Sequence, residues 1–122
     1  MKQNITIKQL NELTLEQKEK LREWWKPATT DLVCDGQYNL NKIGTDPDWN
    51  NKKDAFLPLL SIGQMIEFLL EQDSGYFSID TLPVNSPLDF EMGLIMVTDD
   101  KKTFRKPELA DALWEAVKEV LI

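Results

Sequence analysis

The chain has 122 residues, of which 42% are hydrophobic and 29% charged, and its formal net charge is −7. This composition is that of a globular protein rather than a disordered one, and the length matches a single domain. The 14 basic residues are spread along the chain, so the sequence predicts no nucleic-acid-binding surface, and an acidic membrane surface would repel the protein.

Cysteine usage and the first residues bear on the compartment. Cys34 is the only cysteine, so no internal disulfide can form, as is typical of a reducing compartment. The opening MKQNITIKQL lacks the apolar core of a secretory signal, and the apolar-rich stretch Phe56–Leu70 is too interrupted to span a bilayer. The sequence therefore predicts a cytoplasmic protein that does not contact membranes.

The first predicted helix follows an N-terminal stretch that favours either a short strand or a lead-in. Thr14 and Gln17 have the capping-box spacing that marks the start of a helix. Trp24 and Trp25 fall on its apolar face, and the proline after them ends it. We interpret the tryptophan pair as a packing corner of the core, with one indole at the rim, rather than as a grip for a partner.

A strand pair is predicted next. Asp35-Gly36 suits a two-residue hairpin turn, with strands near Leu32–Cys34 and Gln37–Leu40. The stretch Gly44–Ala55 is a polar loop by composition.

The second predicted helix has the strongest local signal. Ser61 and Gln64 form another capping-box pattern, with Leu60 and Met65 placed as a hydrophobic staple. Apolar side chains cover more than half of its circumference, which predicts a central and mostly buried helix. They are Ile62, Met65, Ile66, Phe68, Leu69 and Leu70.

The last third of the chain predicts two strands and a helix. Tyr76–Leu82 and Asp89–Val97 alternate as strands do, Thr98–Lys106 is a polar turn region, and Pro107 opens the helix at its first position. The expected inner face of that helix has Trp114 and Leu121 at its edge. It consists of Leu109, Leu113, Ala116, Val117 and Val120.

Together these elements predict one α+β domain over residues 1–122. About three helices would pack on a small antiparallel sheet of about four strands. The pairing between the strands is not set by the sequence.

Catalytic and metal-binding patterns are weak. The chain has no histidine, which removes the commonest general base and metal ligand, and Cys34 is interpreted as a small buried side chain. Asp46, Asp48 and Asn50 begin like a calcium loop, but the turning glycine and the final glutamate are missing, so we interpret a solvated loop. The sequence therefore predicts neither a metal nor a cofactor.

One outline of a metal-dependent nuclease exists. Asp89 followed by Asp100 and Lys102 places carboxylates and a lysine in the required order. Triplets of this kind are expected by chance in so charged a chain, so the nuclease is the least favoured of the functions considered.

The last helix carries an acidic stripe formed by Glu108, Asp111, Glu115 and Glu119. A solvated face is the default interpretation, and a docking surface for a basic partner is the alternative. With Trp49 in the polar loop, these residues are the candidate partner-binding site.

Three segments resemble a group of small, uncharacterised proteins encoded by phages and prophages of Gram-positive bacteria. They are LTLEQKEKLREWWKP, LPLLSIGQMIEFLLEQ and ELADALWEAVKEVL. The resemblance covers about a third of the chain. It implies a small phage accessory protein in the host cytoplasm, and it implies no catalytic residue.

The predicted function is therefore non-enzymatic binding of a host protein or complex. Such binding would inhibit a host enzyme or a defence complex, as anti-CRISPR and other counter-defence proteins do. The first alternative is a small-ligand-binding protein or sponge, with a pocket between helices and sheet lined by Trp or Tyr. The second is the metal-dependent nuclease.

Overall fold

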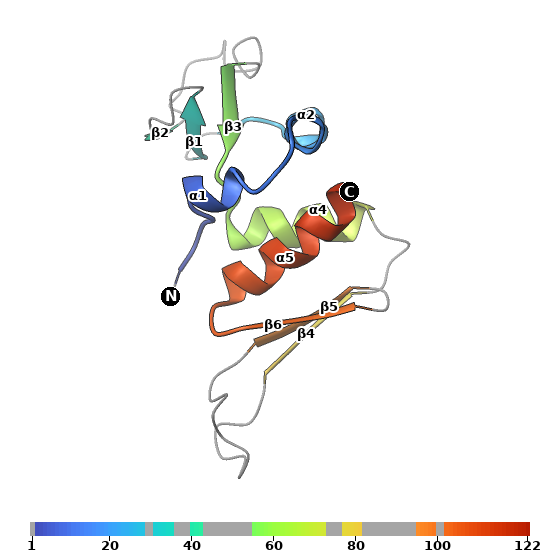
Figure 1. Ribbon diagram of the computed structural model, residues 1–122. Helices are drawn as coiled ribbons and strands as arrows, with labels where there is room; N and C mark the ends of the chain where they lie inside the picture. The colour runs from blue at the N-terminus through green and yellow to red at the C-terminus, as the bar shows by residue number, and fades with distance from the viewer. Residues whose placement is uncertain are drawn as a thin grey trace. The chain divides into compact units, whose positions relative to one another are not determined.

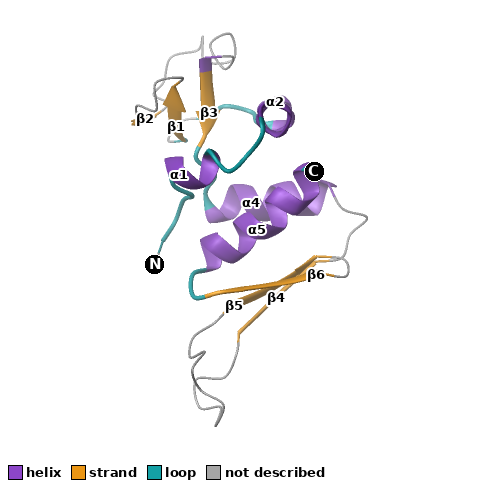
Figure 2. Cartoon of the chain, viewed as in Figure 1, coloured by secondary structure: helices purple, strands orange, loops and turns teal. Residues whose placement is uncertain are grey.

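The computed structural model describes residues 2–28, 31–35, 40–42, 55–72, 77–81, 95–99 and 102–122 (Figure 1). Helices and antiparallel strands are mixed along the chain, which confirms the mixed helix-and-strand class (Figure 2). The helices in this part of the chain are α1 (Ile7–Leu10), α2 (Leu15–Trp24), α4 (Ile62–Gln72) and α5 (Leu109–Leu121). The strands are β1 (Leu32–Asp35), β2 (Leu40–Lys42), β3 (Phe56–Pro58), β4 (Phe77–Thr81), β5 (Ile95–Asp99) and β6 (Lys102–Lys106).

The chain divides into two compact units, which are described separately. The N-terminal unit comprises residues 4–61 and residue 121, and the C-terminal unit comprises residues 1–3, 62–120 and 122. Each unit has its own three-stranded sheet, with the order β2-β1-β3 in the first and β4-β5-β6 in the second. The described strands therefore form two small sheets where the sequence predicted one of about four strands.

In the N-terminal unit, β1 is the central strand and pairs antiparallel with both neighbours. The predicted hairpin of β1 with β2 is confirmed, but its two-residue turn is wrong, because Cys34 pairs with Leu40 and leaves residues 35–39 between them. The reason is that Asp35 is itself a strand residue, paired with Phe56 of β3. The strand β3 was not predicted, since its apolar run continues without a break into the helix that follows.

The tryptophan corner lies where α2 leads toward β1. Helix α2 begins after Thr14 as predicted, and both hydrogen bonds of its capping box are present. Trp25 is 1% exposed and packs with Val33, while the half-buried Trp24 and Phe56 cover that pair. The interpretation of the pair as a packing corner with one indole at the rim is therefore confirmed.

A short helix, α1, precedes α2 and was not predicted. Thr6 and Gln9 cap it with the same reciprocal pair of hydrogen bonds that caps α2. The preceding residues are extended, with Asn4 bridged to Ser61 and the Ile5 N–H donating to the Leu60 carbonyl at 3.0 Å. Of the N-terminal stretch that suggested a strand, Asn4 and Ile5 are therefore extended and bridged, and Ile7–Leu10 is helical.

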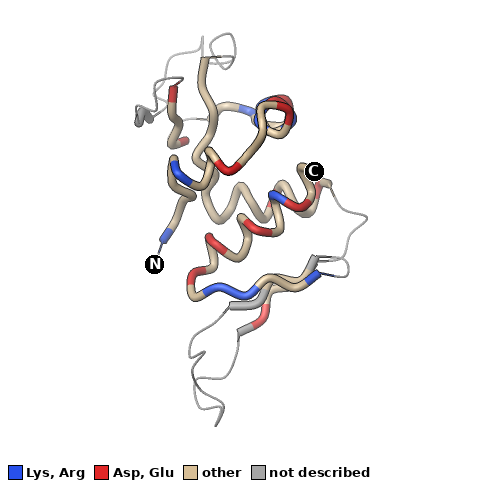
Figure 3. Tube along the Cα trace, in the orientation of Figure 1, with Lys and Arg blue, Asp and Glu red and all other residues tan. Residues whose placement is uncertain are grey.

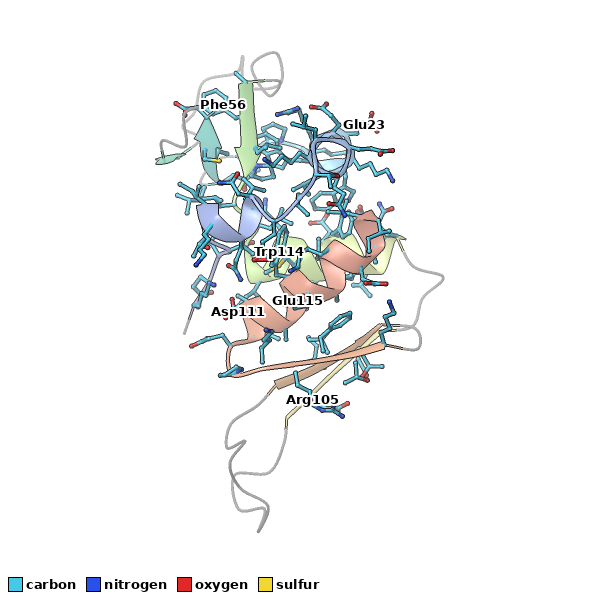
Figure 4. The ribbon with its side chains drawn as sticks, in the orientation of Figure 1. Glu23, Phe56, Arg105, Asp111, Trp114 and Glu115 are labelled. Atoms are coloured by element: carbon cyan, nitrogen blue, oxygen red, sulfur yellow. The ribbon has the colours of Figure 1, made fainter. Side chains whose placement is uncertain are left out.

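In the C-terminal unit, β5 is the central strand of a sheet that α5 covers on one face (Figure 1). Val97 is fully buried and pairs with the half-buried Phe104, while Arg105 is exposed on the other face (Figure 4). The prediction of a polar turn over Thr98–Lys106 is wrong, because Lys102–Lys106 forms β6. This edge strand exposes four of its five side chains, so it lacks the apolar alternation by which a strand is predicted.

The two long helices of this unit differ from expectation in detail. Helix α5 begins at Leu109 with Glu108 as its N-cap, so Pro107 precedes the helix and does not open it. Trp114 and Leu121 are buried although they were expected at the edge, and Leu109 and Val120 are half-buried. In α4, Met65, Phe68 and Leu69 are buried as predicted, but Leu70 is 57% exposed.

Candidate functional site

A cleft of about 440 Å³ opens within the N-terminal unit, between helices α1 and α2 and strands β1 and β3. Its volume lies within the range of small-ligand sites, which is roughly 300–1,000 Å³. The lining combines apolar side chains with two basic and two acidic ones. It consists of Leu10, Asn11, Leu15, Lys18, Glu19, Arg22, Cys34, Asp35, Ala55, Phe56 and Leu57.

One face of α2 forms the helical wall of the cleft. Leu15, Lys18, Glu19 and Arg22 are spaced by three, four and seven residues, so they lie on the same side of the helix. The capping box fixes where this face begins, because the Thr14 hydroxyl accepts the third N–H of the helix at 3.1 Å. Leu15, at the first helical position, is 81% exposed.

The opposite wall is formed by β1 and β3, in which Cys34 is paired with Leu57. Phe56, labelled in Figure 4, starts β3, and its carbonyl accepts a hydrogen bond from Arg22 Nε at 3.2 Å. Pro58 has no N–H to donate. Because β3 is an edge strand, these two features block the addition of a further strand there. A ligand that adds a strand at the edge of β3 is therefore disfavoured.

The charged groups of the cleft are unequally paired. Arg22 forms an ion pair with Glu19 on the same helix. Lys18 Nζ donates to the Asn11 side-chain oxygen at 3.3 Å, and among the described residues no carboxylate lies within ion-pair distance of Lys18. Within the described ranges, Lys18 is thus the cation of the cleft whose partner is neutral.

Cys34 lines the cleft but has little accessible surface, being 2% exposed. Burial raises the pKa of its thiol, Asp35 raises the pKa further, and Lys18 lowers it. The thiol is therefore protonated at neutral pH and a poor nucleophile. This confirms its interpretation as a small buried side chain.

The predicted acidic stripe lies along α5 in the C-terminal unit (Figure 3), where three of its four carboxylates form ion pairs and Glu108 accepts a backbone N–H. The Lys2 backbone N–H donates to Glu108 at 3.3 Å, and Lys2 Nζ lies 2.5 Å from Asp111. Lys118 pairs with Glu115 at 3.1 Å, and Lys102 pairs with Glu119.

These pairs change what the stripe presents to a partner. The side chains of Lys2, Lys102 and Lys118 compensate one carboxylate each, so the stripe attracts a basic surface less strongly than its sequence predicts. Asp111 and Glu115, labelled in Figure 4, are also only partly exposed. Docking at this stripe stays a prediction, and Trp49 lies outside the described residues.

The other sequence candidates also fall largely outside the described residues. Asp46, Asp48 and Asn50 do so, as do Asp89 and Asp100 of the nuclease outline. Lys102 lies on β6. Within the described ranges, no cluster of three or more acidic, histidine or cysteine side chains is arranged to hold a metal ion.

The cleft was not among the sequence candidates. The spacing of Leu15, Lys18 and Arg22 was a signal for one wall, but the opposite wall depends on β3, which carried no strand signal. Among the described residues, no helix is long and apolar enough to cross a membrane. No protein-family model, curated protein or solved structure was found to match this chain.

Proposed function

We propose that this chain is a small, acidic phage accessory protein that acts without catalysis, by binding a protein of the host cell through the cleft beside α2. Inhibition of a host enzyme or defence complex is the role that such binding would serve. The resemblance of three sequence segments to phage-encoded proteins supports the assignment as a phage accessory protein. The cleft supports the choice of the binding surface.

The exposure of Leu15 is the observation that carries this proposal. A large aliphatic side chain that is 81% exposed at the border of a cleft, next to Lys18 and Arg22, combines an apolar centre with a charged margin. Protein interfaces have this arrangement, with an apolar core surrounded by a polar rim. A partner side chain that enters the cleft would cover Leu15 and remove its apolar surface from water.

Affinity capture with paired variants tests the proposal. The tagged wild-type chain is expected to retain a defined protein from a Gram-positive host lysate, and Leu15→Asp is expected to lose it. Leu70→Asp is the matched control, because Leu70 is another exposed leucine, on α4, and does not line the cleft. Equal retention by both variants would exclude the cleft as the binding surface, and loss with Leu70→Asp alone would place it elsewhere.

A second candidate function, a small-ligand-binding protein or sponge, is favoured by the volume of the cleft. The predicted position between helices and sheet agrees with the cleft, but its aromatic lining residue is Phe56 rather than a tryptophan or tyrosine. Mass spectrometry of molecules released from the purified protein tests this function. An empty protein that shows no thermal shift with any ligand tried would count against it.

A further inference from the structure

The positive charge of Lys18 is the feature of the cleft from which a ligand can be inferred. Arg22 donates its Nε–H to the Phe56 carbonyl and pairs with Glu19, so those charges and acceptors are matched. Lys18 has three N–H groups, of which one reaches the neutral oxygen of Asn11. The Asn11 amide nitrogen has no acceptor among the described residues. Within the described part of the chain, Lys18 is therefore a cation of the cleft that no carboxylate pairs.

The rest of the lining favours an apolar body beside this charged group. Leu10 and Leu57 lie in the cleft together with Phe56, and Leu15 stands at its exposed border. Phe56 is held in place because it packs against Trp25 and Val33. A ligand that fills this space needs apolar or aromatic groups about the size of a single side chain.

We infer that the cleft binds small amphipathic carboxylates, with the apolar body among Leu57, Phe56 and Leu15 and the carboxylate held by Lys18 and Asn11. Charge-assisted hydrogen bonds from an ammonium group to a carboxylate are stronger than neutral ones. Asp35, on the β1 wall, repels the carboxylate and moderates its affinity. This inference rests on the second candidate function, the binding of a small ligand.

Three probes with one body and different head groups test the inference. They are 3-phenylpropionate, 3-phenyl-1-propanol and 3-phenylpropylamine, titrated into the ¹⁵N-labelled full chain and followed by the backbone amide signals in NMR spectra. The carboxylate is expected to shift the amides of the cleft and to bind about threefold more tightly than the alcohol, as exposed charge pairs allow. The amine is expected to bind most weakly.

Three variants locate the charge. Lys18→Gln is expected to weaken binding of the carboxylate about threefold and to leave the alcohol unchanged. Lys20→Gln is the matched control, since it removes the same charge from α2 at an exposed residue outside the cleft. Asp35→Asn is expected to tighten binding of the carboxylate, an effect opposite in sign to that of Lys18→Gln.

The possible results distinguish the preference for a carboxylate from the binding of any small ligand in the cleft. Equal affinities for the three probes, or equal effects of Lys18→Gln and Lys20→Gln, would overturn the carboxylate assignment while leaving the cleft as a ligand site. If no probe shifts any cleft amide, the carboxylate assignment fails, and the second candidate function is decided by the mass spectrometry of released molecules. Neither result bears on the proposed binding of a host protein, because that proposal is tested separately with Leu15→Asp.

Discussion

The Asp31 carboxylate holds the corner at which the chain leaves α2. It accepts one hydrogen bond from the indole N–H of Trp25 at 3.1 Å and another from the Ala28 backbone N–H at 3.0 Å. Trp25 is 1% exposed, so its indole donor depends on the Asp31 carboxylate rather than on bulk water. The Asp31 carboxylate thus provides an acceptor for the indole N–H of Trp25, while the rest of the indole packs against apolar side chains.

We expect Asp31→Ala to lower the free energy of unfolding by about 1–3 kcal/mol, because it leaves a buried donor without an acceptor. Urea unfolding followed by tryptophan fluorescence measures the change. Asp31→Asn is the control, since it keeps a side-chain oxygen in place and should lose less. An Asp31→Ala variant as stable as the wild type would show that the indole hydrogen bond does not stabilise the corner.

The buried thiol of Cys34 makes stability depend on pH in the alkaline range. Burial raises its pKa above the ordinary value of 9.0, so the folded chain holds the thiol proton more tightly than the unfolded chain does. The unfolded state therefore binds fewer protons once the pH exceeds its own thiol pKa, and stability falls as the pH rises from there. Below that pH the contribution is complete.

Unfolding in urea between pH 8 and pH 10 checks this effect. The free energy of unfolding of the wild type is expected to decline across the range more steeply than that of Cys34→Ala, which has no thiol to titrate. Thiol labelling at pH 8 should also be slow in the folded protein and fast in urea. Parallel pH profiles for the two proteins would contradict the assignment.

At the scale of elements, α2 depends on its N-terminal cap. The Thr14 hydroxyl accepts the Gln17 N–H at 3.1 Å, and the Gln17 side chain accepts the Thr14 N–H at 2.8 Å. We expect Thr14→Ala to lower the free energy of unfolding by about 1 kcal/mol, the usual value of such a cap. Thr14→Ser retains the hydroxyl and should remain close to wild type.

This prediction also bears on the cleft, because the cap determines where Leu15 and Lys18 stand on the helix. Thermal unfolding followed by circular dichroism measures the loss of stability, and titration with 3-phenylpropionate measures the loss of binding. A Thr14→Ala variant with unchanged unfolding would mean that tertiary packing alone fixes the start of α2.

Elements with local signals were predictable from the sequence, and those that depend on distant partners were not. Helices α2 and α4 carry capping-box sequence patterns and apolar faces within a short stretch, and both begin where the sequence predicted. β3 and β6 are edge strands whose few residues carry no alternation, so only their pairing with β1 and β5 defines them. The cleft was missed for the same reason, since Cys34 meets Leu57 through a pairing that no local pattern encodes.

The acidic stripe shows a further limit of sequence reasoning. The positions of Glu108, Asp111, Glu115 and Glu119 along one helix could be predicted, but their cationic partners could not. Lys2 comes from the other end of the chain and Lys102 from an unpredicted strand. Net charge alone therefore overstated the field of this surface.

At the scale of the whole molecule, the two compact units raise the question of whether the chain unfolds as one domain, as its length predicts. Each unit comprises roughly half of the chain. A domain of about 60 residues buries only about 60% of the surface that its unfolded chain exposes, and its stability is marginal. Domains shorter than about 150 residues usually unfold in one step. We therefore expect a single cooperative transition.

The chain offers a natural reporter in each unit. Trp25 lies in the N-terminal unit, and Trp114 is fully buried in the C-terminal unit, where its indole nitrogen has no hydrogen-bond partner among the residues that the structure describes. Their indole N–H signals, assigned with Trp→Phe variants, can be followed by NMR through a urea titration. Both signals are expected to disappear at the same urea concentration.

Two core substitutions, one in each unit, make this test decisive. Val33 and Val97 are both fully buried, and truncating either to alanine is expected to cost about 2 kcal/mol. With a typical urea dependence, each variant should move both indole transitions to lower urea by about 1 M. If Val33→Ala moved the Trp25 transition alone and Val97→Ala moved the Trp114 transition alone, the units would unfold independently and the single-domain prediction would be wrong. Equal shifts of both signals by either variant would establish one cooperative domain, in which a substitution in the C-terminal unit changes the fraction of chains able to bind at the cleft of the N-terminal unit.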